Sequence, residues 1–186
     1  MTETLRPPVQ TLSMRGAGDP WPLVAEAYTR DGIVVLTEAL EAPALADLRA
    51  EAEAARAQVD AAFALSGTAS HAGTTAGENY SIPGRHRLRP ALAALIAGPS
   101  MRALTRATIG AEAWLFTDQF LMKGPRSRMD FNWHQDGGYV PVAHRPFLVV
   151  WIPLDPVDTG NGTIRAIPFG RMPERQLLPH REHPTN

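Results

Sequence analysis

Residues 147–154, Phe-Leu-Val-Val-Trp-Ile-Pro-Leu, form a strongly apolar run of the length of one strand. Such a run, rich in branched and aromatic residues, predicts a strand that is buried on both faces. Further strands are predicted at 114–122, 131–136 and 163–167, with turns at 137–138 and 158–162. Short strands separated by turn signals are typical of packed sheets, so residues 111–170 are expected to form a β-sandwich core.

The part of the chain before this region is predicted to be mainly helical, which makes the fold class α+β. Helical spacing of apolar residues predicts helices at 21–29, 42–65 and 90–109, the last interrupted near Gly98-Pro99, and a short strand at 33–36. Residues 66–87 are rich in Gly, Ser, Thr and His and are predicted to be a lid-like loop. Residues 1–20 are predicted to be an irregular lead-in, 21–110 the helical part, and 171–186 a polar tail, all within one domain.

Composition narrows the classes of function. The chain has 186 residues, a formal net charge of −1 and no cysteine. A nearly neutral chain is not expected to bind nucleic acid or acidic membranes through general charge attraction. Without cysteine, any metal must be held by histidine and carboxylate side chains. No stretch has the length and apolarity of a signal peptide or a membrane span, so a cytoplasmic location is expected.

His134 and Asp136, in Trp133-His134-Gln135-Asp136, are the sharpest candidates for a site. On a strand, positions i and i+2 face the same side, so one imidazole and one carboxylate would converge. They would supply two of the three ligands in the two-histidine, one-carboxylate arrangement of non-haem iron oxygenases. The alternative is a polar strand edge on which Asp136 caps the Gly-Gly turn, and the pair taken alone favours that alternative.

Four segments, considered together, favour the metal-ligand interpretation over the polar strand edge. They are Tyr28-Thr-Arg-Asp-Gly-Ile-Val-Val-Leu36, Phe131-Asn-Trp-His-Gln-Asp-Gly-Gly-Tyr139, Val149-Val-Trp-Ile-Pro-Leu-Asp155 and Asn161-Gly-Thr-Ile-Arg-Ala-Ile-Pro168. In their order and spacing the chain resembles the phytanoyl-CoA dioxygenase family over nearly its whole length.

The resemblance implies a double-stranded β-helix, or jelly roll, flanked by N-terminal helices. It implies Fe(II) held by His134 and Asp136, which are then the catalytic residues. It also implies 2-oxoglutarate as co-substrate, converted to succinate and carbon dioxide while a small-molecule substrate is hydroxylated. An aspartate at position 136, where halogenating relatives carry a small residue, favours hydroxylation.

Three further residues are candidates for binding the co-substrate. Trp151 matches a strand tryptophan that can lie beside 2-oxoglutarate in this family, and the alternative is an ordinary core aromatic. Lys123, the only lysine, could meet a carboxylate as a point charge, and its alternative is a solvated loop lysine. Gln119 shares a strand face with Lys123 if no bulge intervenes. Tyr80, in the predicted lid, is more simply a surface aromatic.

The chain departs from the family in two respects. The resemblance implies a second iron-binding histidine and a 2-oxoglutarate-binding arginine further downstream, and the chain ends at Asn186 before both. A solvated side chain is the simpler interpretation of each nearby histidine, namely His144, His180 and His183. We therefore expect a jelly roll truncated at its C-terminus, with an open sheet edge through which two copies could pair.

Three functions stay open at this point. The first is a 2-oxoglutarate-dependent hydroxylase, and the second is a catalytically inactive, truncated jelly roll that binds a small molecule or a partner. The third is another metal enzyme of cupin-like shape, although cupins usually offer several histidines on neighbouring strands and this chain has no such cluster. The substrate cannot be named, although the loop Arg126-Ser127-Arg128 could meet an anion.

Overall fold

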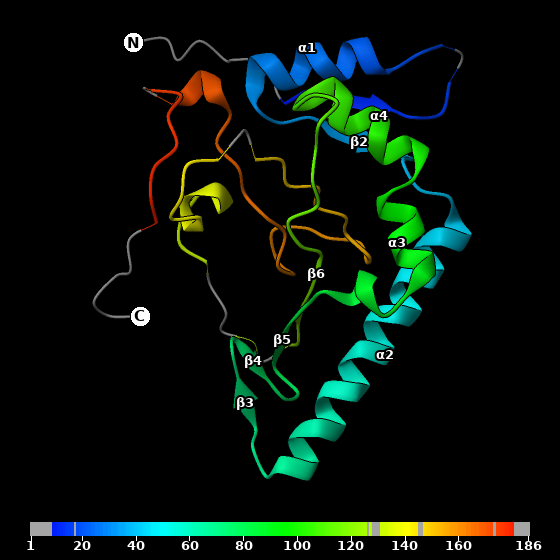
Figure 1. Ribbon diagram of the computed structural model, residues 1–186, viewed down its shortest axis with the longest axis vertical. Helices are drawn as coiled ribbons and strands as arrows, with labels where there is room; N and C mark the ends of the chain where they lie inside the picture. The colour runs from blue at the N-terminus through cyan, green and yellow to red at the C-terminus, as the bar shows by residue number, and fades with distance from the viewer. Residues whose placement is uncertain are drawn as a thin grey trace.

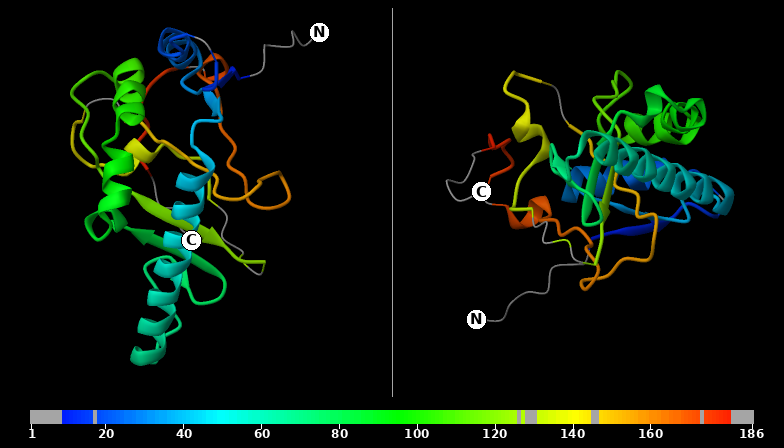
Figure 2. Two further views of the ribbon diagram at one scale, coloured as in Figure 1. Left: turned by 90° about the vertical axis from the view of Figure 1, so that its right-hand side faces the viewer. Right: turned by 90° about the horizontal axis from the view of Figure 1, so that it is seen from below.

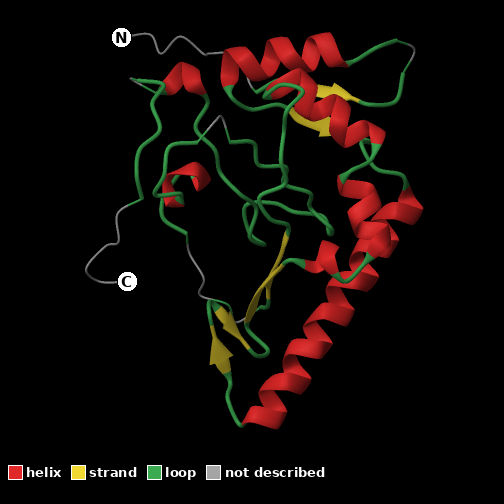
Figure 3. Ribbon diagram, viewed as in Figure 1, coloured by secondary structure: helices red, strands yellow, loops and turns green. Residues whose placement is uncertain are grey.

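The computed structural model describes residues 9–16, 18–125, 127, 131–144, 147–172 and 174–180. Within them the protein is a mixed α/β structure with helices along one side and a small antiparallel sheet (Figure 1). The helix Trp21–Asp31 lies at one end of the long axis and the four-stranded sheet near the other, with irregular segments between them (Figure 3). No helix in these ranges is both long and apolar enough to cross a membrane.

Two helices confirm the prediction from sequence closely. Helix α1 spans Trp21–Asp31 and helix α2 spans Ala42–Ser66, and each carries a proline in its first turn, where the missing N–H costs nothing. Gly32 and Gly67 end them with φ of 70° and 68°, in the left-handed region that glycine adopts without strain. The predicted break in the third helix is also confirmed, since α3 is Pro90–Ile96 and α4 is Pro99–Thr108.

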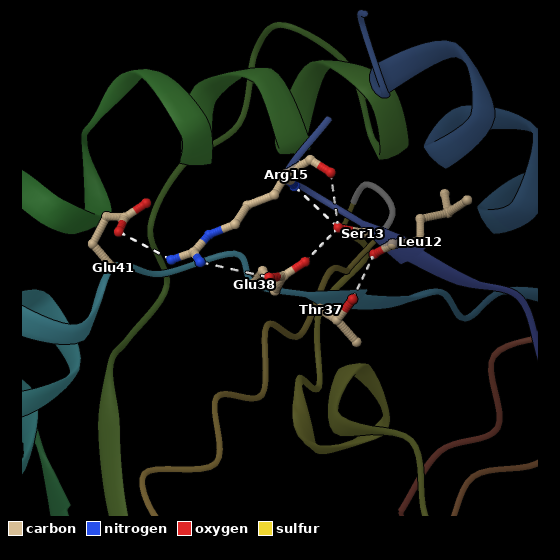
Figure 4. A network of polar contacts seen from close by, with 6 residues as sticks. All are labelled: Leu12, Ser13, Arg15, Thr37, Glu38 and Glu41. Carbon is tan, nitrogen blue, oxygen red and sulfur yellow. Dashed lines mark hydrogen bonds and ion pairs between the residues drawn. The ribbon is translucent and has the colours of Figure 1, made fainter. Parts of the chain in front are cut away.

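The lead-in is more ordered than predicted. Strand β1, Thr11–Ser13, pairs in parallel with β2, Val35–Thr37, so residues 11–13 are not irregular. Arg15 makes ion pairs with Glu38 (3.6 Å) and Glu41 (3.2 Å), and the Ser13 hydroxyl donates to Glu38 (Figure 4). Ser13 and Glu38 are 25 positions apart in the sequence. Local sequence patterns therefore did not indicate their contact.

The predicted lid at 66–87 is wrong. It contains three strands, β3 (Ser70–His71), β4 (Thr74–Thr75) and β5 (Asn79–Pro83). They form a four-stranded sheet with β6 (Gln119–Lys123) in the order β3-β4-β5-β6, and a 3-10 turn, η1, follows at Arg85–Arg87. Ala72 and Gly73 turn the chain with positive φ, which lets β3 and β4 pair across a short connection. Residues 66–87 are therefore largely part of the sheet and its turns and are not one irregular loop.

Tyr80 is part of the core and not a surface aromatic. It is 4% exposed and packs with Ala55 and Ile82, while Phe120 and Met122 lie against this cluster. Its hydroxyl donates to Asp60 of α2 (2.6 Å) and accepts from Gly77 N–H (2.7 Å). One face of the β5–β6 pair is thereby held against α2, which runs beside the sheet in the views of Figure 2.

The strands predicted after residue 110 form only in part. Among the described residues of 111–170, β6 is the only strand, and 131–136, 147–154 and 163–167 have no ladder hydrogen bonds. The turn predicted at 158–162 is confirmed, because Asn161 and Asp158 side chains bond its backbone. A strand needs a neighbour for its N–H and C=O groups, and in the described chain the apolar run lacks one: Val149, Val150 and Trp151 are 38–55% exposed.

Candidate functional site

His134 and Asp136 lie together at the end of an irregular segment. Asp136 begins the 3-10 turn η2, Asp136–Tyr139, so the predicted strand at 131–136 is wrong. The side chains meet nevertheless: His134 Nε2 is 3.1 Å from Asp136 Oδ1, and the side chains are 25% and 45% exposed. Gln135 between them is extended (φ −117°, ψ 128°), so the two side chains lie on the same side of the backbone although the segment pairs with no neighbouring strand.

The imidazole of His134 is held in one tautomer. Its Nδ1 is 2.6 Å from the Asn132 carbonyl oxygen, and because a carbonyl can only accept, Nδ1 must carry the proton. Nε2 then faces the carboxylate either with a second proton or with a lone pair. An Nδ1–H bonded to a backbone carbonyl, with Nε2 pointing at a cation, is the usual arrangement of metal-bound histidine.

The spacing of these two atoms suits a shared metal ion. Ligand atoms at about 2.1 Å from a metal and in neighbouring octahedral positions lie about 3 Å apart, close to the separation seen. The donor set, one imidazole nitrogen and one carboxylate oxygen, also suits a divalent iron. The residues present therefore fit two of the ligand positions of such an ion.

Among the described residues, no third protein ligand lies beside the pair. Across the parts of the chain that the structure describes, no group of three or more His, Asp and Glu side chains is placed to hold a metal. His144 Nε2 is 3.0 Å from the Gly137 carbonyl oxygen, and the His180 ring stacks on Tyr139 at 4.0 Å between centroids. Both residues therefore contact the motif while remaining exposed, as the predicted solvated side chains are. His183 lies outside the described residues.

Gln119 and Lys123 share one face of β6, as expected if no bulge intervenes. The β5–β6 register is regular from Pro83 opposite Gln119 to Asn79 opposite Lys123. The Gln119 amide donates to the Ser81 hydroxyl on the same face. The Lys123 ammonium lies over the Phe131 ring, 5.5 Å from its centroid, and that ring is 6.1 Å from the ring of His134.

All five predicted site residues border one open basin. Trp151, 38% exposed, lines it together with the ligand pair, Gln119 and Lys123. The basin volume is about 4950 Å³, far above the roughly 300–1,000 Å³ of a fitted ligand pocket. Its lining extends from Val9 to His180 and includes most elements of the fold, so the basin neither groups the five residues into one site nor defines the shape of a substrate. The loop positions Arg126 and Arg128 lie outside the described residues.

Two features of this region were missed from sequence. His86 Nδ1 bonds Asp118 at the basin wall, and Asp118 also accepts from the His86 backbone N–H (3.3 Å). Gln135, between the two ligands, bonds the backbone of residues 176 and 178. Both contacts join segments more than 30 positions apart, and no local pattern signals them.

Comparison with known proteins gave one match. A family model described as phytanoyl-CoA dioxygenase matches residues 28–184, most of the chain. Neither the search of curated proteins nor that of solved structures returned a match.

Proposed function

The chain belongs to the phytanoyl-CoA dioxygenase family, and we propose that it is an Fe(II)- and 2-oxoglutarate-dependent dioxygenase that hydroxylates a small organic molecule. The observation that carries the proposal is the 3.1 Å separation of His134 Nε2 and Asp136 Oδ1, with Nδ1 of the same ring fixed by the Asn132 carbonyl. Family membership supports an oxygenase, and this geometry supports the two residues as its iron ligands.

His134 and Asp136 would hold the metal. When bound, Fe(II) supplies the redox chemistry that couples oxidation of 2-oxoglutarate, to succinate and carbon dioxide, to hydroxylation of the second substrate. The residues themselves bind and orient the ion. The Asn132 carbonyl keeps the proton on Nδ1, so Nε2 offers its lone pair, and Asp136 contributes the negative charge that holds a dication.

Lys123, Gln119 and Trp151 are proposed to receive 2-oxoglutarate. A flexible ammonium can pair with a carboxylate, an amide can donate to it, and an indole can cover the carbon chain. The shared face of β6 supports this assignment for Gln119 and Lys123. For Trp151 the support is its match to the strand tryptophan of the family.

The proposed function is tested by measuring succinate released from 2-oxoglutarate with Fe(II) and ascorbate. We expect turnover well above that of the same protein with the iron chelated. A non-catalytic role as a binding protein is the second candidate, favoured by the lack of a third ligand beside the pair in the described residues. Release no faster than with chelator, together with intact folding, would exclude the enzyme for this chain.

We also propose that the family's double-stranded β-helix forms here when the apolar run at 147–154 finds a neighbouring strand. The exposure of Val149 and Trp151 supports this, because apolar strand residues normally become buried by pairing. A second copy is the proposed source of the neighbour. Light scattering is expected to give the mass of a dimer at micromolar concentration, and a monomer at all concentrations would refute this proposal.

A further inference from the structure

Residues 174–180, here called the strap, run from the end of α1 to the ligand loop at 131–139, at the left in Figure 1. Sequence alone predicted only a polar tail here. Each end of the strap is held by several contacts, and the two ends touch different parts of the fold.

The first end is held by Arg175. Its guanidinium donates to the carbonyls of Thr29 (3.4 Å) and Arg30 (3.2 Å), which lie in the last turn of α1 and lack helical partners. The same guanidinium lies 5.0 Å over the ring of Phe169. That ring packs on Gly32, where a Cβ would lie 2.7 Å from it, so the helix end and the strap form one packed corner.

The second end is held by Gln135. The side-chain amide accepts from the Leu178 N–H (2.6 Å) and donates to the Gln176 carbonyl (3.2 Å), as a neighbouring strand would. The His180 N–H adds a bond to the Gly138 carbonyl (2.8 Å). Gly138 also permits this approach by its size, because a Cβ there would collide with the Leu178 carbonyl oxygen.

These contacts continue to the ligand pair. The His180 ring stacks on Tyr139 at 4.0 Å, and Tyr139 meets the His134 ring edge-on at 5.5 Å. Gln135 itself is the residue between the two ligands in the chain. Any displacement of its backbone therefore moves His134 and Asp136 relative to each other.

We propose that the strap braces the ligand loop against α1, and that Gln135 is a positioning residue through which it sets the separation of His134 and Asp136. The part that concerns the metal rests on the proposed function; the docking of the strap does not. Groups that orient metal ligands without touching the metal typically change metal affinity about 10- to 100-fold when removed.

The test compares Gln135→Met with Gln176→Met. Both changes replace an amide by an apolar side chain of similar length. Gln176, however, bonds Gln135 through its backbone carbonyl, which the substitution keeps, and its side-chain amide donates to Glu174. Amide hydrogen exchange at Leu178 reports strap docking without any metal. Titration with Co(II) alone reports the ligand pair.

In Gln135→Met we expect Leu178 exchange to accelerate about tenfold, as for loss of one hydrogen bond. We also expect Co(II) affinity to fall about tenfold, with a changed absorption spectrum of the bound ion. Gln176→Met should resemble the wild type in both. Arg175→Met removes the contacts at the other end of the strap and does not alter the ligand loop, so it should also accelerate exchange of the Leu178 amide. This variant still tests the docking of the strap if Gln135→Met folds poorly.

The outcomes separate the two proposals. Unchanged Leu178 exchange in both Gln135→Met and Arg175→Met would overturn the strap. Faster exchange with unchanged Co(II) affinity would overturn the positioning role of Gln135. Failure of the wild-type protein to bind Co(II) would contradict the proposed metal site and with it the positioning role, whereas the exchange data would still decide whether the strap docks.

Discussion

Replacing Asp136 by alanine is expected to abolish succinate release and to weaken Co(II) or Fe(II) binding by at least about 100-fold, since changes outside the ligand shell already cost 10- to 100-fold. The change removes the only carboxylate seen within 4 Å of His134 in the described residues and leaves one protein ligand of the pair. Calorimetric titration of metal into the variant measures the affinity, and the succinate assay measures the turnover.

Asp155→Ala is the matched control for this result. Asp155 is an 82% exposed carboxylate that pairs with Arg49 at 3.4 Å, and such surface pairs contribute little to stability. It should bind metal and turn over like the wild type. If Asp136→Ala kept wild-type metal affinity, the 134–136 pair could not be the metal site, whatever the activity of the protein.

Replacing Tyr80 by alanine is expected to lower the free energy of unfolding by about 3–5 kcal/mol, as for other large aromatic residues removed from a core. The ring fills the space between α2 and the β5–β6 pair, and its hydroxyl joins Asp60 to the Gly77 N–H. Urea unfolding followed by circular dichroism measures the change.

A graded variant separates the ring from the hydroxyl. Tyr80→Phe keeps the packing but leaves Gly77 N–H and Asp60 without this partner, so we expect a loss of about 1–3 kcal/mol. Tyr139→Phe changes the same group at a 52% exposed position and should stay within about 0.5 kcal/mol of the wild type. A Tyr80→Ala protein as stable as the wild type would show that this cluster does not hold the sheet to the helix.

The candidate site was predictable because its two key residues are neighbours in sequence. Gln135 between them is extended, so His134 and Asp136 meet although 131–136 forms no paired strand and Asp136 begins a 3-10 turn. The shared face of Gln119 and Lys123 was predictable for a related reason: it needs only one regular strand. The contacts of Gln135 and of His86 depend on distant segments and were not predictable.

The sequence by itself determined the helices, their ends and the family. Proline in the first turn and glycine after the last act within a few residues, so α1, α2 and the break between α3 and α4 need no tertiary information. Only the tertiary structure decided which extended segments pair. Residues 79–83 became a strand because β6 lies beside them, while the more apolar 147–154 did not, since a strand needs a neighbour for its backbone groups.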